Sequence, residues 1–138
     1  ETGMRTMHGL MVSGFPNLFL CVGGFVFQLG ANYAHGIDVQ AGHVAYTITE
    51  LGSRGVKAAN VSITAEERWI ADQLETKGGG FVLGGSPDTC TPGYYNQEGT
   101  TQRYRDVRRE TYSKGVGAYM KLLRQWREDG ELEGLELN

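Results

Sequence analysis

The stretch GFPNLFLC, residues 14–21, constrains the fold of this 138-residue chain more than any other segment. Proline has no backbone N–H and forces the residue before it to be extended, so Pro16 suits the first position of a strand. The residues that follow, from Leu18 to Cys21, form a continuous apolar run, which is typical of a strand covered on both faces. We therefore predict a core strand over residues 18–21, with a turn and a short hairpin in residues 4–20 leading into it.

Three segments have apolar residues at helical spacing and predict helices. The first, over residues 37–51, ends at Gly52 and Gly55. The second begins at a capping box formed by Thr64 and Glu67 and ends near the glycines at 78–80. The third ends at Gly130. The apolar positions of these helices are Ile37, Ala41, Val44, Ala45, Ile48 and Leu51, then Trp69, Ile70 and Leu74, then Tyr119, Leu122, Leu123 and Trp126.

Two other segments carry weaker signals. The end of the chain contains Leu132, Leu135 and Leu137, which is too apolar for a free tail and predicts that the tail docks on the fold. Residues 81–96 are rich in Gly, Ser, Pro and Asp, which predicts irregular chain with a turn at Pro92 and Gly93.

Charge and composition limit the function classes. The net charge of -3 argues against a generally basic nucleic-acid binder. No apolar stretch is long enough to cross a membrane and no signal peptide precedes the first segment, so we expect a cytoplasmic protein with no membrane partner. Reduced, buried or inert thiols are then expected at Cys21 and Cys90.

Four segments resemble, in order along the chain, the flavin-dependent monooxygenases of the Baeyer-Villiger type. GFPNLFLC, residues 14–21, resembles the last strand of their FAD domain, and NYAHGIDVQAGHVAYTI, residues 32–48, looks like the last helix of that domain with its entry loop. CTPGYYNQEG, residues 90–99, resembles a late loop near the nicotinamide cofactor, and LLRQWREDGELEGLEL, residues 122–137, is similar to the carboxy-terminal helix and tail. The resemblance identifies the chain as the C-terminal part of such an enzyme.

The resemblance implies an α/β fragment of a flavoprotein that has two dinucleotide-binding domains. Residues 1–55 would supply the last strand and helix of the FAD-binding domain. Residues 56–138 would form C-terminal helices, a cofactor-side loop and a docking tail. The implied activity is FAD- and NADPH-dependent insertion of one oxygen atom from O2 into a ketone or a soft heteroatom of a small-molecule substrate. The implied partners are the upstream FAD and NADPH domains of the same enzyme.

The chain lacks the sequence that binds the pyrophosphate of either cofactor. A dinucleotide fold needs G-x-G-x-x-G or A between a strand and a helix. The nearest text, residues 115–120, ends in Met120 and follows no predicted strand. We therefore expect the chain to be inactive alone, and the cofactors FAD and NADPH to require other sequence.

The resemblance also implies cofactor-binding residues, while the catalytic residues stay unknown. A helix amino terminus favours negative charge, so the start of the helix after residue 32 suits the flavin ring. The alternative is that Asn32 only caps the helix and Tyr33 is a core residue. The implied set is Gly30, Asn32 and Tyr33 beside the flavin and Tyr94 and Arg105 beside NADPH.

Two patterns leave alternatives open. The three histidines have no helical pairing and no Cys-x-x-Cys companions, so no metal site is predicted, and His35 is expected on the surface. The basic and aromatic stretch 94–114 fits contact with NADPH phosphates, a nucleotide or nucleic-acid binding module, or simply a solvated face. Nucleic acid is the less favoured partner. A silent interaction fragment is the remaining alternative.

Overall fold

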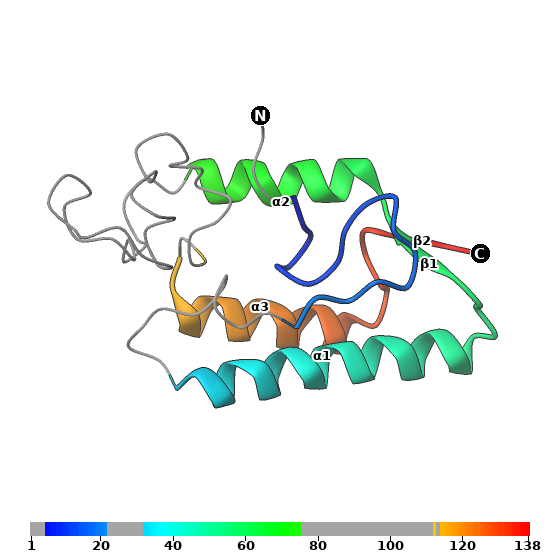
Figure 1. Cartoon of the computed structure of the whole chain (residues 1–138), viewed down its shortest axis with the longest axis horizontal. Helices are drawn as coiled ribbons and strands as arrows, with labels where there is room; N and C mark the ends of the chain where they lie inside the picture. Colours follow the sequence, from blue (N-terminus) through cyan, green and yellow to red (C-terminus); the bar gives the residue numbers. More distant parts are fainter. Residues whose placement is uncertain (1–4, 22–31, 76–111, 113) are drawn as a thin grey trace, which may run out of the picture.

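The computed structural model describes residues 5–21, 32–75, 112 and 114–138. In this part of the chain three helices, α1 (Tyr33–Ser53), α2 (Ile63–Glu75) and α3 (Val116–Asp129), accompany two short strands, β1 (Ala59–Val61) and β2 (Leu135–Leu137). Helices α1 and α3 pack side by side, α2 lies on the opposite side, and the N-terminal segment 5–21 runs between them (Figure 1). The result is the α/β mixture that the sequence predicts, with a core made of clusters around the N-terminal segment, α3 and the tail.

Helix α1 forms where the sequence predicts it, and the face that it buries is mostly polar. Its fully buried positions follow helical spacing and are mostly polar or small; they are Gly36, Gln40, His43, Thr47 and Leu51. The predicted apolar face lies to one side of these positions. There Ala41, Ala45 and Ile48 are exposed, while Ile37 and Val44 are half-buried. The prediction of the helix is therefore confirmed, and of its six predicted apolar positions only Leu51 is buried in the described part of the chain.

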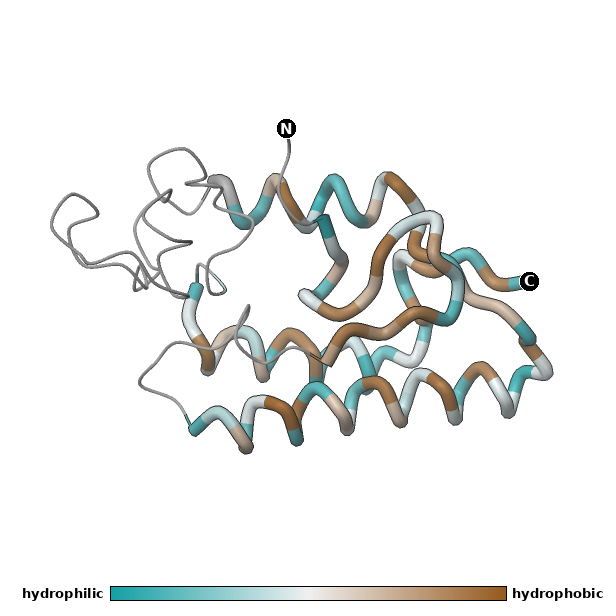
Figure 2. The backbone as a smooth tube through the Cα atoms, in the orientation of Figure 1, coloured by the Kyte–Doolittle hydropathy of each residue, from teal (hydrophilic) through white to brown (hydrophobic). Residues whose placement is uncertain are grey.

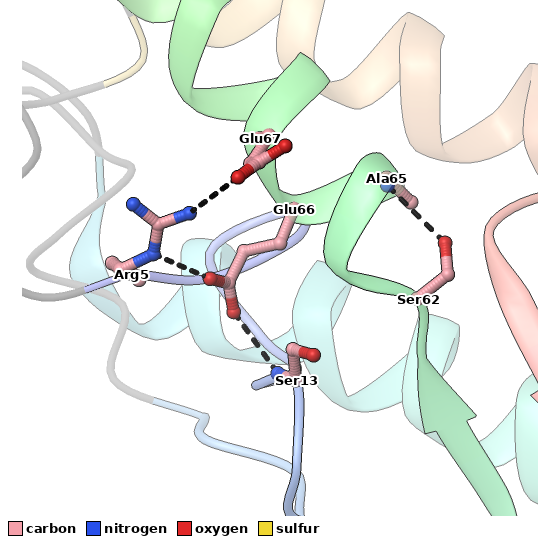
Figure 3. Close-up of polar contacts among 6 residues, drawn as sticks. All are labelled: Arg5, Ser13, Ser62, Ala65, Glu66 and Glu67. Carbon is pink, nitrogen blue, oxygen red and sulfur yellow. Dashed lines mark hydrogen bonds and ion pairs between the residues drawn. The ribbon is translucent and has the colours of Figure 1, made fainter.

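Helix α2 begins at Ile63, and its cap lies two residues before the predicted cap Thr64. Ser62, not Thr64, lies at the cap position between β1 and α2, and its hydroxyl oxygen accepts a 3.2 Å hydrogen bond from the Ala65 N–H (Figure 3). The Ser62 N–H donates to the Gly134 carbonyl at 2.9 Å, so pairing with the tail fixes the turn at this residue. The capping box at Thr64 and Glu67 is wrong because tertiary pairing, which the local pattern does not contain, decides where the strand ends.

Helix α3 and the docked tail agree with the sequence. Tyr119, Leu123 and Trp126 are buried, and Gly130 ends the helix in a left-handed conformation with φ 71° while its N–H donates to the Trp126 carbonyl. Leu132 is buried, and β2 pairs with β1 in an antiparallel register that places Leu135 opposite Val61. The docking of the tail is confirmed, although the strand that receives it was not predicted.

Gly134 shows how closely the tail is packed. Its φ is +91°, a conformation that favours glycine. A Cβ atom at this position would lie 2.7 Å from the Met7 sulfur and 2.9 Å from the Ala65 side chain. The backbone of Gly134 therefore lies so close to Met7 and Ala65 that a residue with a Cβ atom would clash with them.

The N-terminal segment forms the predicted hairpin but not the predicted strand. Met7 and Met11 exchange backbone hydrogen bonds of 2.7 and 3.1 Å around a turn. Within residues 18–21 only Phe19 makes a bridge, to Met11, and Cys21 is exposed rather than buried. The edge of β1 that a strand at 18–21 could use is already bonded to the Asn17 backbone and side chain.

The distribution of hydropathy follows this arrangement. Hydrophobic residues run along the N-terminal segment in the interior and also along α1 at the outside of the molecule (Figure 2). The predicted irregular chain over 81–96, with its turn at Pro92 and Gly93, and the predicted end of the second helix at 78–80 lie outside the described residues.

Candidate functional site

The amino terminus of α1 is the first candidate site. Asn32 adopts an extended conformation, with φ -63° and ψ 116°, and its side-chain oxygen accepts hydrogen bonds from the N–H groups of Ala34 at 3.0 Å and His35 at 3.3 Å. This is an N-cap, since the side chain satisfies donors that the helix leaves open. The carboxamide oxygen of Asn32 is therefore occupied by the helix itself, and its NH2 group is the part that remains chemically suited to a ligand.

The residues around this cap are exposed. Tyr33 keeps 57% of its surface accessible, so it is not a core residue in this chain, and His35 is on the surface as expected. An exposed aromatic ring beside a helix amino terminus suits a planar group that carries negative charge. The structure thus brings Asn32 and Tyr33 together. The other predicted site residues, Gly30, Tyr94 and Arg105, lie outside the described residues.

A second candidate is a buried polar layer between α1 and α3. The Tyr119 hydroxyl donates to the His8 carbonyl at 2.8 Å and accepts from the Gln40 side chain at 3.4 Å. Burial raises the pKa of the Tyr119 phenol above its ordinary value, so the phenol stays protonated. These bonds join the N-terminal hairpin to α1 and α3, which gives the layer a structural role.

His8 and His43 meet inside this layer. Their ring centroids lie 5.5 Å apart, and only 7% of His8 and 1% of His43 is accessible. Burial lowers the pKa of His8 to about 3, with a further contribution from His43, and lowers the pKa of His43 to about 4, with a further contribution from Arg127. Both imidazoles are therefore neutral near neutral pH.

No sequence pattern predicts that His8 and His43 lie together. Their positions, 8 and 43, match no metal-binding spacing, and only the tertiary packing of the hairpin on α1 brings them together. A signal did exist in α1, because Gln40, His43 and Thr47 recur at helical spacing and mark a polar stripe. Among the described residues no group of three or more His, Cys, Asp or Glu side chains could hold a metal ion.

The hairpin is also tied to α2 by a buried carboxylate. Glu66 accepts a 2.7 Å hydrogen bond from the Arg5 side chain and a 3.0 Å hydrogen bond from the Ser13 N–H (Figure 3). The neighbouring Glu67 reaches Arg5 only at 4.0 Å and is exposed. Glu66 thus joins residues on both sides of the hairpin to the first turn of α2.

No helix in the described ranges has the length and apolar character needed to cross a membrane.

Sequence comparison finds several curated relatives, although no protein-family model matches the chain. The chain is 32% identical over 136 residues to the Baeyer-Villiger monooxygenase ATR8 of Stachybotrys chlorohalonatus, which covers 99% of this chain and 21% of that protein. It is 34% identical over 134 residues to the FAD-binding monooxygenase hmp7 of Hypomyces subiculosus, which covers 97% of this chain and 21% of that protein. The chain thus spans about a fifth of the length of these relatives.

Solved structures give a consistent result. The polycyclic ketone monooxygenase from the thermophilic fungus Thermothelomyces thermophila is similar with a TM-score of 0.75 and 30% identity, over 99% of this chain and 21% of that chain. An oxidized steroid monooxygenase bound to NADP is similar with a TM-score of 0.70 over 98% of this chain and 23% of that chain. The identity to the second structure is 20%, so it supports the fold alone.

Proposed function

Since the chain belongs to the flavin-dependent Baeyer-Villiger monooxygenases, of whose length it spans about a fifth, we propose that it is the C-terminal part of an enzyme that uses FAD, NADPH and O2 to insert one oxygen atom into a ketone or a soft heteroatom. In this proposal residues 1–55 complete the FAD domain, and residues 56–138 form the C-terminal helices, a cofactor-side loop and the docked tail. The chain alone would be inactive, and the FAD and NADPH domains would be its partners.

The exposed apolar flank of α1 is the observation that carries the proposal. It consists of the exposed Ala41, Ala45 and Ile48, with the half-buried Ile37 and Val44 along its edge, and these residues follow helical spacing. Ile48 has 54% of its surface accessible. A helix that buries a polar stripe and exposes an apolar one has a second packing surface, because exposed apolar patches mark sites that another surface covers. In the complete enzyme this flank would pack against the remainder of the FAD domain.

A substitution on this flank should therefore act differently in the two contexts. In the 138-residue chain, Ile48→Asp should change the free energy of unfolding by less than about 0.5 kcal/mol, because the side chain is exposed. In the complete enzyme the same change would bury a charge, and we expect the content of bound FAD after purification to fall severalfold. FAD content is measured by flavin absorbance relative to protein.

Thr49→Asp is the matched control, because Thr49 is also exposed on α1 but lies outside the apolar flank. It should leave FAD content unchanged in the complete enzyme. Equal FAD content in the Ile48 and Thr49 variants would show that the flank is not a packing surface and would remove the main support for the proposal.

Within the proposed enzyme, FAD would accept electrons from NADPH and supply the oxygenating chemistry. The contribution proposed for this chain is to bind and orient the flavin at the amino terminus of α1. Asn32 would present its NH2 group beside the positive end of the helix, and Tyr33 would contribute an aromatic face. Gly30 would allow the backbone to approach the ring. The exposure of Asn32 and Tyr33 in this chain supports this assignment.

Tyr94 and Arg105 are proposed to contact NADPH. If they do, Tyr94→Ala and Arg105→Ala in the complete enzyme should each raise the Michaelis constant for NADPH about tenfold, because each removes a stacking face or a charge-assisted hydrogen bond. Steady-state kinetics with FAD content measured in parallel provide the test. Arg124→Ala, in which an exposed arginine of α3 is removed, is the control. Unchanged NADPH kinetics in both variants would return residues 94–114 to a solvated face.

A further inference from the structure

The His8 and His43 pair lies where four separate parts of the chain meet. His8 belongs to the N-terminal hairpin and His43 to α1. The His8 ring contacts Trp69 of α2 with centroids 5.3 Å apart and Trp126 of α3 with centroids 5.7 Å apart. The His43 ring lies 4.8 Å from Trp126. A change in the charge of this pair therefore affects the packing of the hairpin against all three helices.

The surroundings of the pair suit neutral imidazoles and oppose charged ones. Aromatic rings of α2 and α3 surround His8, and the Gln40 amide and the Tyr119 phenol are the polar groups nearby on α1 and α3. The charges that act on the pair are the two imidazoles on each other and Arg127 on His43. On α2, the carboxylate of Glu66 accepts hydrogen bonds from the Arg5 side chain and the Ser13 N–H of the N-terminal segment.

Hydrogen bonding does not compensate a charge on either ring. In the described part of the chain, His8 Nδ1 and both ring nitrogens of His43 are buried with no hydrogen-bond partner. A protonated imidazole donates from both nitrogens, so each added proton would place a buried charge and an unmet donor in an apolar site. Burying such groups costs free energy, and this cost is removed only when the protonated rings move into water.

The hairpin is the part best able to move. His8 itself has a left-handed backbone, with φ 57°, and Gly9 follows with φ 70°. A left-handed conformation is uncommon for a residue other than glycine, so the burial of the His8 ring helps to hold the turn in place. Loss of that burial would loosen the turn and expose the neighbouring Leu10 and Met11, which are now buried.

We propose that His8 and His43 form a pH-dependent latch, which holds the N-terminal hairpin against α1, α2 and α3 when both rings are neutral and releases it when they are protonated. The latch is independent of the cofactor site, because His8 and His43 belong to the interior layer and not to the exposed amino terminus of α1. Acidification would thus open the core from within.

The sign of the effect follows from proton binding. Each ring binds a proton more weakly in the folded chain, with a pKa of about 3 or about 4, than at the ordinary value of 6.5 in the unfolded chain. The stabilisation is therefore complete above pH 6.5 and is lost as the pH falls from 6.5 toward 4 and then 3. One unit below 6.5, each ring raises the unfolding equilibrium constant up to about tenfold, so the pair raises it up to about a hundredfold.

The test measures denaturant unfolding of the 138-residue chain by tryptophan fluorescence at pH 8 and at pH 5.5. In the parent chain the unfolding constant should rise about tenfold to a hundredfold at the lower pH. In the double variant His8→Gln, His43→Gln the unfolding constant should rise less than about threefold. His35→Gln, which removes the exposed histidine, should behave as the parent chain. The latch would be overturned if the unfolding constant of the parent chain changed less than threefold between the two pH values. It would also be overturned if the constant changed equally in the parent chain and the double variant.

A second measurement holds even where the double variant fails to fold. The imidazole proton resonances of His8 and His43, followed by NMR in the parent chain, should keep the position of the neutral ring down to pH 5.5 for as long as the chain is folded. A midpoint near pH 6.5 for either ring in the folded state would contradict the proposal. At pH 5.5, the amide protection factors of Leu10 and Met11 should be lower than those at the centre of α3, because the hairpin opens without the rest of the chain. Equal protection in both places would replace release of the hairpin with global unfolding.

Discussion

The 138-residue chain alone is expected to show no saturable binding of FAD at micromolar concentration and no NADPH-dependent oxygen uptake. Most of the affinity of a dinucleotide fold comes from a pyrophosphate held at a helix amino terminus behind a glycine-rich turn. The sequence contains no such fingerprint, and the text nearest to it, residues 115–120, forms the cap and first turn of α3. Titration with FAD followed by flavin fluorescence, and an oxygen electrode, measure the two quantities.

The complete enzyme is the positive control for both measurements. It should bind FAD close to one molecule per chain and consume oxygen when NADPH is added. Stoichiometric FAD on the 138-residue chain, together with oxygen uptake, would contradict the proposal that FAD and NADPH binding requires other domains. It would also contradict the proposal that Asn32 and Tyr33 form only part of the flavin site.

Replacement of Glu66 by glutamine is expected to destabilise the chain by about 2 kcal/mol, which is roughly a thirtyfold increase in the unfolding constant. Only 6% of the Glu66 side chain is accessible, and the variant would lose the charge that Arg5 and the Ser13 N–H now share. The figure stays below the usual cost for a buried ion pair because 36% of the Arg5 side chain reaches water. Denaturant unfolding at pH 7.5 provides the measurement.

Glu67→Gln is the matched control for this change. Glu67 is the next residue of the same helix, reaches the same arginine at 4.0 Å, and has 63% of its side chain accessible. Its loss should cost less than about 0.5 kcal/mol. Equal effects of the two substitutions would show that Glu66 contributes only through its general negative charge near the start of α2.

The sequence predicts the helices well because their signals are local. The cap at Asn32, the stop at Gly130 and the apolar spacing of α3 each lie within a few residues of the feature they set, and the structure confirms them. The cap of α2 is the exception. Its position depends on the bond from Ser62 to Gly134, two residues that are far apart in the sequence.

The remaining differences concern which face of α1 is covered and whether residues 18–21 form a strand. An apolar stripe on α1 predicts that this helix packs, but cannot tell which partner covers it, and within this chain the covered stripe is the polar one that contains Gln40 and His43. The apolar run at 18–21 likewise predicts a strand, while the edge of β1 is bonded to Asn17 instead. The pairing of His8 with His43 depends on the packing of the hairpin against α1, so no local sequence motif predicts it.

The bond between the Tyr119 hydroxyl and the His8 carbonyl joins residues 111 positions apart. Contacts of such long range form late, because the loop they close is costly in entropy. During synthesis the hairpin leaves the ribosome long before α3 exists, and its Leu10 and Met11 are without their final covering. The hairpin therefore reaches its final packing only after α3 has been made.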